Sequence, residues 1–214
     1  QVALAPGPVT CASRGIRVVL EGKTAHASQP ETGLSPGLAL AGITQGLAAL
    51  LRGTPAQEDF RMATVTHLSM GERSFGVAPG GGELWATLRT RCDSHMAALV
   101  EKAEGLVHTA ADGLGVRISY HDIFPASVND AALTALAEEA LTQSGIQVSQ
   151  GSLPMRWSED FGRFAQICPT VMLFPGAGRD TPALHNPDYD FPDDLIAVGT
   201  QAFLSILTRM DTPS

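Results

Sequence analysis

Two loops hold the residues of this sequence whose types and positions could do chemistry. His185 lies in the polar segment 175–187, which directly follows the wholly apolar run 169–174. Ligands of open α/β sheets bind at the carboxyl ends of strands, so the His185 imidazole could bind a metal or shuttle a proton. On spacing alone the alternative is a plain surface histidine, because one histidine does not make a metal site.

A second histidine, His26, stands among small residues in the segment 22–28, GKTAHAS. Small neighbours permit the close approach of a ligand or of another surface. An ordinary turn explains the same residues, so this segment stays open between a site and a turn.

Two further polar groups fall at the expected ends of elements. Ser158, Glu159 and Asp160 stand where a short helix is expected to begin, and capping explains carboxylates there. Arg89 ends a strand that is apolar on one face, so it could pair with a substrate carboxylate or lie in solvent.

Other polar groups carry weaker signals. The pair Glu138-Glu139 is interpreted as a solvated helix face, and the glycines 80–82 lack the Lys-Ser/Thr of a phosphate-binding loop. Four histidines fall on expected helices or strands without nearby liganding partners and are interpreted as structural. They are His67, His95, His108 and His121.

The segments that must position these residues alternate between strand and helix. Strands are predicted at 14–22, 60–70, 83–90 and 116–120, and helices at 38–51 and 93–112, capped by Asp93 or Ser94. This β-α-β-β-α-β order predicts a ferredoxin-like, four-stranded antiparallel sheet covered on one side by two helices.

Residues 123–214 have a different character. The sequence predicts a helix over 129–144 capped by Asn129 or Asp130, a buried strand over 169–174, a polar loop and a closing helix over 195–210. One clear strand is too few to complete a doubly wound sheet, so this region is expected to be part of a larger α/β domain.

Composition excludes several classes of protein. The 214 residues are 44% apolar and carry a net charge of −8, which argues against nucleic acid or an anionic membrane as partner. Three widely spaced cysteines favour reduced thiols and a cytoplasmic location. Residues 1–6 lack the features of a signal peptide, and the missing initiator Met suggests a processed or truncated chain.

Four motifs, in this order, resemble the dinuclear-metal amidohydrolases and peptidases that include aminoacylase, hippurate hydrolase and carboxypeptidase G. The N-acyl-amino-acid amidohydrolase branch is the most similar. The motifs are GKTAHAS at 22–28, ATLRT at 86–90, SEDF at 158–161 and LHNPDYDFPDD at 184–194. The resemblance implies that residues 14–122 form the family's lid (dimerisation) domain. Residues 1–13 and 123–214 would then be a portion of its zinc-peptidase-like α/β catalytic domain.

The resemblance also implies roles for single residues. The intact enzyme would hold two divalent metal ions, zinc or manganese, with His185 as one ligand. His26 would polarise the scissile carbonyl, often in the active site of a dimer partner. Arg89 would hold the substrate carboxylate, and Ser158 with Gly176 would line the substrate pocket.

The family's other metal ligands belong to motifs upstream of the lid, and this sequence lacks them. The chain is therefore expected to be a fragment, inactive and without bound metal by itself. It also has Gly76-Val77-Ala78-Pro79 where the family usually has Asn-Val-Ile-Pro, which leaves substrate choice open.

The sequence thus predicts a metal-dependent hydrolase that cleaves the amide bond of N-acyl amino acids or small peptides and forms a homodimer through its lid. One alternative is a dipeptidase or aminopeptidase of the same family. Another is a non-catalytic ferredoxin-like module for dimerisation or ligand binding, which would show no metal dependence.

Overall fold

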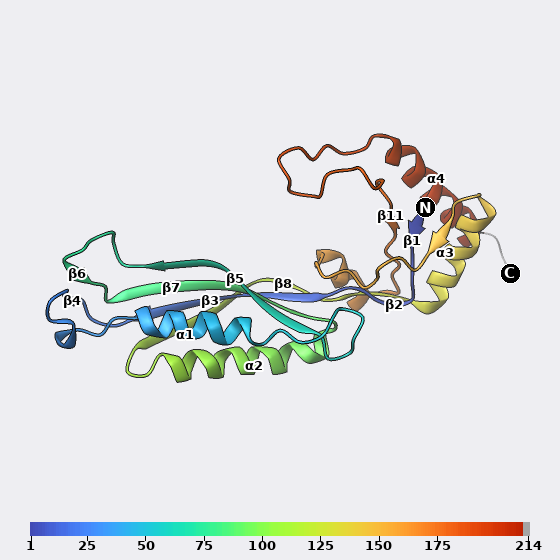
Figure 1. Ribbon diagram of the computed structural model, residues 1–214. Helices are drawn as coiled ribbons and strands as arrows, with labels where there is room; N and C mark the ends of the chain where they lie inside the picture. Colours follow the sequence, from blue (N-terminus) through green and yellow to red (C-terminus); the bar gives the residue numbers. More distant parts are fainter. Residues whose placement is uncertain (212–214) are drawn as a thin grey trace. The chain divides into compact units, whose positions relative to one another are not determined.

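A computed structural model describes residues 1–211. These residues form two compact units (Figure 1). The first, called the sheet unit, comprises Thr10–Ala126 and Pro154–Asp160. The second, called the terminal unit, comprises Gln1–Val9, Ser127–Leu153 and the described residues from Phe161 onward.

The sheet unit is a four-stranded antiparallel sheet with two helices. Its strands are β3 (Ala12–Glu21), β5 (Arg61–Met70), β7 (Gly81–Thr90) and β8 (Gly115–Phe124), and its helices are α1 (Gly37–Ala48) and α2 (Asp93–Ala110). The strand order is β5-β7-β3-β8, and each neighbouring pair is antiparallel. This is the ferredoxin-like topology that the order of strands and helices predicted.

Alternation of side chains along β3 explains why the helices cover one face. Ile16, Val18 and Leu20 are buried, whereas Arg17 and Val19 point to the other face. Figure 1 shows α1 and α2 side by side along the covered face. The helical side chains buried there include Leu40, Ile43, Leu47, Leu99, Ala103 and Val107.

The uncovered face carries polar and aromatic side chains around Trp85, which is 43% exposed. The Arg17 guanidinium lies 5.5 Å from the centre of the Trp85 ring. Arg17 also pairs with Glu83 across 2.7 Å. His67 and His121 lie on either side of Trp85, with ring centres at 6.2 and 6.3 Å.

A small two-stranded sheet extends one end of the main sheet. It pairs β4 (Ala25–His26) with β6 (Val77–Ala78), next to a 3-10 helix η1 (Pro30–Thr32). The backbones approach closely here, since Gly22 N donates to Gly80 O across 2.6 Å. A Cβ on Gly80 would lie 2.5 Å from the Thr24 nitrogen, so only glycine fits.

The terminal unit contains two long helices and short strands. Its elements, with two that extend across its boundary, are β1 (Val2–Ala3), β2 (Gly7–Thr10), β9 (Ser127–Asn129), α3 (Ala131–Gln143), β10 (Val148–Ser149), η2 (Asp160–Gln166), β11 (Phe174–Pro175) and α4 (Asp194–Met210). The central strand β1 pairs parallel with β10 and antiparallel with β11. Val2, Leu141 and Ile206 belong to the buried core of this unit.

The strand predicted over 169–174 is wrong, because only Phe174 enters a ladder. The backbone before it bonds to other groups. Met172 N donates to the Asn129 side chain across 2.7 Å, and Thr170 O accepts from Asp130 N across 2.8 Å. The buried Asn129 therefore takes the place of a neighbouring strand.

Two predicted helix starts have different outcomes. Asp130 caps α3, since its carboxylate accepts from Leu133 N across 2.9 Å. The predicted cap of α2 is wrong, because Cys92 occupies the N-cap position with an extended backbone. Asp93 is the first helical residue, and its carboxylate accepts from Ala126 N instead, at 3.3 Å.

Candidate functional site

The sequence-predicted residues Arg89 and Ser158 lie together in the sheet unit. Arg89 Nη1 donates to Ser158 Oγ across 2.8 Å and to the Arg156 carbonyl across 3.3 Å. Both partners of this guanidinium are neutral, so neither cancels its charge. The arrangement leaves a positive group beside a hydroxyl, which suits a carboxylate ligand.

Backbone contacts bring Ser158 to Arg89 from 69 positions away in the sequence. The segment 154–160 lies against the chain that enters β3. There Cys11 N donates to the carbonyls of Met155 and Trp157, each across 3.2 Å. The short helix expected to begin among residues 158–160 begins at Asp160, as the 3-10 helix η2.

The electrostatics at this end of the sheet favour an anion. Burial raises the pKa of the Cys11 thiol to about 11, although Arg89, Arg156 and Arg91 each act to lower it. Burial also lowers the pKa of Arg89 from its ordinary value. A thiol that stays neutral leaves the charge of the nearby guanidiniums available to a ligand.

His26 presents a hydrogen-bond donor to its surroundings. Its Nδ1 accepts from Ser28 N across 3.2 Å and lies 2.8 Å from Ser28 Oγ. Because a ring nitrogen that accepts a backbone N–H bears no proton, the neutral ring carries its proton on Nε2. His26 is exposed, so this donor is open to a ligand or to another surface.

The tetrapeptide 76–79, which departs from the expected Asn-Val-Ile-Pro, lies directly beside His26. Val77 pairs with His26 in the small sheet, and Ala27 N donates to Gly76 O across 3.0 Å. A Cβ on Gly76 would meet nothing within 4 Å. The departure from the family pattern therefore falls next to a predicted catalytic residue and leaves open space there.

His26 and Arg89 lie at opposite ends of the β3–β7 strand pair. The register runs from Ser13 opposite Arg89 to Glu21 opposite Gly81, and His26 lies beyond that second end. Eight steps of about 3.4 Å separate the ends by about 27 Å. One small substrate cannot touch both side chains of the same chain.

The remaining predicted residues, His185 and Gly176, belong to the terminal unit. Gly176 follows β11 directly and donates its N–H to Gln1 O across 3.0 Å. His185 is exposed and has a φ of 73°. Such a left-handed backbone costs a non-glycine residue on the order of 1–3 kcal/mol and is concentrated at functional sites.

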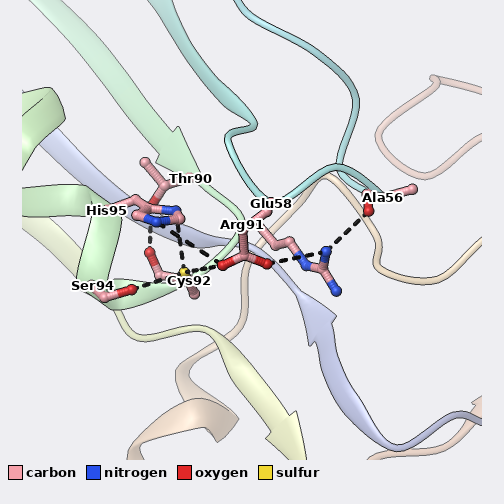
Figure 2. A network of polar contacts seen from close by, with 7 residues as sticks. All are labelled: Ala56, Glu58, Thr90, Arg91, Cys92, Ser94 and His95. Carbon is pink, nitrogen blue, oxygen red and sulfur yellow. Dashed lines mark hydrogen bonds and ion pairs between the residues drawn. The ribbon is translucent and has the colours of Figure 1, made fainter.

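His185 offers a single ligand. Among residues 1–211, one group of three metal-ligating side chains brings its ligand atoms within 4.8 Å of one another, and it consists of Glu58, Cys92 and His95 (Figure 2). The interpretation of His95 as a histidine without liganding partners is therefore wrong. Sequence spacing missed this group because Glu58 comes from a loop before β5, far from α2 in the sequence.

This sheet and these motifs belong to a known family of peptidases. The profile of peptidase family M20/M25/M40 matches residues 12–209. The chain belongs to this family, which confirms the resemblance to dinuclear-metal amidohydrolases and peptidases.

Particular relatives resemble the chain over nearly its whole length. An N-acetylcysteine deacetylase of Bacillus subtilis is 22% identical over 96% of this chain and 54% of its own. An IAA-amino acid hydrolase (ILR1-like 2) of Arabidopsis thaliana is 23% identical over 89% of this chain and 45% of its own. The chain thus spans about half the length of the curated relatives it matches.

Solved structures show the same fold. A dinuclear metal binding peptidase from the M20 family of Bacillus subtilis superposes with a TM-score of 0.76 at 20% identity, over 99% of this chain and 54% of that one. A putative aminohydrolase from methicillin-resistant Staphylococcus aureus gives 0.77 at 20% identity, over 98% and 55%. Within residues 1–211, no helix is both long and apolar enough to cross a bilayer.

Proposed function

We propose that this chain is part of a metal-dependent hydrolase that cleaves the amide bond of N-acyl amino acids or small peptides. Residues 14–122 would be its lid, and residues 1–13 and 123–214 a portion of its catalytic domain. The observation that carries the proposal is the Arg89–Ser158 pair, a guanidinium with neutral partners placed for a carboxylate. Relatives named for an N-acetyl amino acid and for an amino acid conjugate support it.

His185 is proposed to hold one of two divalent ions, zinc or manganese. The exposed imidazole on a left-handed backbone fits this role, since such strained residues are concentrated at functional sites. The other ligands would come from outside these 214 residues. When bound, the ions would supply an activated water and polarise the substrate carbonyl.

His26 would stabilise the charge that develops on the scissile carbonyl oxygen. Its exposed Nε2–H is a suitable donor, and removal of such a donor from an enzyme costs about 100- to 1,000-fold in kcat. The separation of about 27 Å from Arg89 along the strands favours a homodimer in which His26 acts on the partner's substrate.

Arg89 would bind the carboxylate of the amino acid, with Ser158 beside it and Gly176 lining the pocket. A planar guanidinium binds a carboxylate through two parallel hydrogen bonds, which fixes the orientation of the substrate.

All three cysteines are free thiols, which supports a cytoplasmic location.

The experiment measures hydrolysis of a panel of N-acyl amino acids by this chain joined to its upstream coding sequence, with zinc or manganese. We expect turnover that needs the metal and the free carboxylate, and that His185→Ala abolishes. Preference for substrates with a free α-amino group would favour the dipeptidase alternative. Metal-independent ligand binding without turnover would favour the non-catalytic module.

A further inference from the structure

A mixed set of donor atoms gathers where the loop before β5 meets the start of α2 (Figure 2). Cys92 Sγ lies 3.4 Å from His95 Nδ1 and 4.0 Å from Glu58 Oε1. His95 Nε2 lies 4.0 Å from the same carboxylate oxygen. We call these three residues the Glu58–Cys92–His95 cluster.

The spacing of these atoms is close to that of a tetrahedral zinc site. Zinc bonds of about 2.0 Å to nitrogen and oxygen and about 2.3 Å to sulfur place neighbouring ligand atoms about 3.3–3.6 Å apart. With His95 Nδ1 as the ligand atom, the sulfur–nitrogen distance of 3.4 Å meets this value, and the Sγ–Oε1 distance of 4.0 Å requires only a small contraction. One imidazole nitrogen binds the ion, and one ligand atom from each of the three residues can be taken such that all lie within 4.8 Å of one another.

Neighbouring groups contact two residues of the cluster, Glu58 and Cys92. Arg91 Nη1 lies 3.4 Å from Glu58 Oε2 and donates to Ala56 O across 3.0 Å, which leaves Oε1 directed at the cluster. The hydroxyl of Thr90 donates to the Cys92 carbonyl across 2.8 Å. Such surrounding contacts orient metal ligands and raise their affinity.

We propose that the Glu58–Cys92–His95 cluster binds one zinc ion, with water in the fourth position. Sulfur, imidazole and carboxylate together suit zinc and not the harder magnesium or calcium. On binding, the Cys92 thiol loses its proton to solvent and the thiolate bonds to the metal. The charges of the thiolate and the carboxylate balance the two charges of the ion, while the other carboxylate oxygen of Glu58, Oε2, stays beside Arg91.

Such a bond would join two segments that are far apart in the sequence. Glu58 belongs to the loop between α1 and β5, whereas Cys92 is the N-cap residue of α2 and His95 lies in its first turn. Because zinc binds only when both are in place, it stabilises the folded sheet unit. The proposal does not depend on the amidohydrolase reaction, since its test is binding.

The test titrates the untagged 214-residue chain with zinc against a chromophoric chelator, and with cobalt as a spectroscopic substitute. We expect one zinc per chain, a thiolate-to-cobalt absorption band, and a higher Tm with zinc. Cys92→Ser should abolish the band, and Cys92→Ser or His95→Ala should weaken zinc binding by at least about 100-fold. Glu58→Gln should weaken it less.

Two matched variants identify the site. Cys168→Ser removes a thiol that is exposed and lies outside the cluster, and His185→Ala removes the proposed ligand of the catalytic metals. Neither variant should change the zinc affinity or the cobalt band. A band that survives Cys92→Ser, or zinc binding that depends on Cys168 or His185, would overturn the proposal. The proposal would also be overturned if the folded chain bound no zinc and its Cys92 were alkylated equally fast with and without zinc.

Discussion

His26 and Arg89 lie at opposite ends of one pair of strands, about 27 Å apart along β3 and β7. Both are expected to act on the substrate. The sheet is rigid over this length, because ten consecutive residue pairs join β3 to β7. If Arg89 and His26 act on one substrate as proposed, that His26 comes from another copy of the chain.

Mixed dimers of the intact protein test this arrangement. His26→Ala and His185→Ala should each be nearly inactive alone, because each removes a group needed in every active site. After mixing and subunit exchange, about a quarter of the wild-type activity should return, since half of random dimers are mixed and each restores one of its two sites. Amide hydrolysis before and after exchange is the measurement. If differential tagging shows that mixed dimers form and these dimers remain inactive, His26 and Arg89 act on different substrates.

Replacement of Arg89 tests the role of the guanidinium. Arg89→Lys keeps the charge but loses the planar fork, so we expect kcat/KM to fall by about 10- to 100-fold, mainly through KM. The control is a substrate whose carboxylate is a carboxamide. Wild type and variant should cleave it at nearly equal rates, and an equal loss on both substrates would show that Arg89 acts on something other than the carboxylate.

Two glycines near His26 differ in what they tolerate. Gly80→Ala places a methyl group 2.5 Å from the Thr24 nitrogen, so we expect a loss of about 1–3 kcal/mol in the free energy of unfolding. Gly76→Ala is the matched control, since nothing lies within 4 Å of its Cβ, and it should be nearly neutral. Urea unfolding of both variants gives the comparison. Equal stabilities would mean that the β4–β6 connection relaxes without cost.

The ion pair between Arg17 and Glu83 predicts a stability difference that depends on pH. The Arg17 hydrogen bond lowers the pKa of Glu83 below its ordinary value of 4.5. A lowered folded-state pKa adds stability above pH 4.5 that is lost as pH falls through the lowered value. Glu83→Gln should therefore cost up to about 1 kcal/mol at pH 7 and almost nothing at about pH 2, because the pair is partly exposed.

Thermal unfolding across this pH range checks the prediction. Glu101→Gln, on the exposed side of α2, serves as the control and should show the same small difference at each pH. A constant deficit for Glu83→Gln down to pH 2 would point to lost packing in place of lost charge.

Local patterns predicted most of the sheet unit, because its strands alternate and its helices carry an apolar stripe. In β3 the buried Ile16, Val18 and Leu20 follow the period of two that the sequence displays. The strand prediction for residues 169–174 was wrong for a physical reason. Its apolar side chains suit a strand, yet its backbone bonds go to the Asn129 side chain and to Asp130.

The candidate site was likewise predicted from the sequence only in part. The motifs around His26, Arg89, Ser158 and His185 are short and local, so the sequence by itself determined the family and the residue types available for chemistry. The tertiary structure decided which of them meet. It joined Arg89 to Ser158, separated Arg89 from His26, and built the Glu58–Cys92–His95 cluster. Such contacts depend on strand register and on how loops pack, and neither is encoded by spacing along the chain.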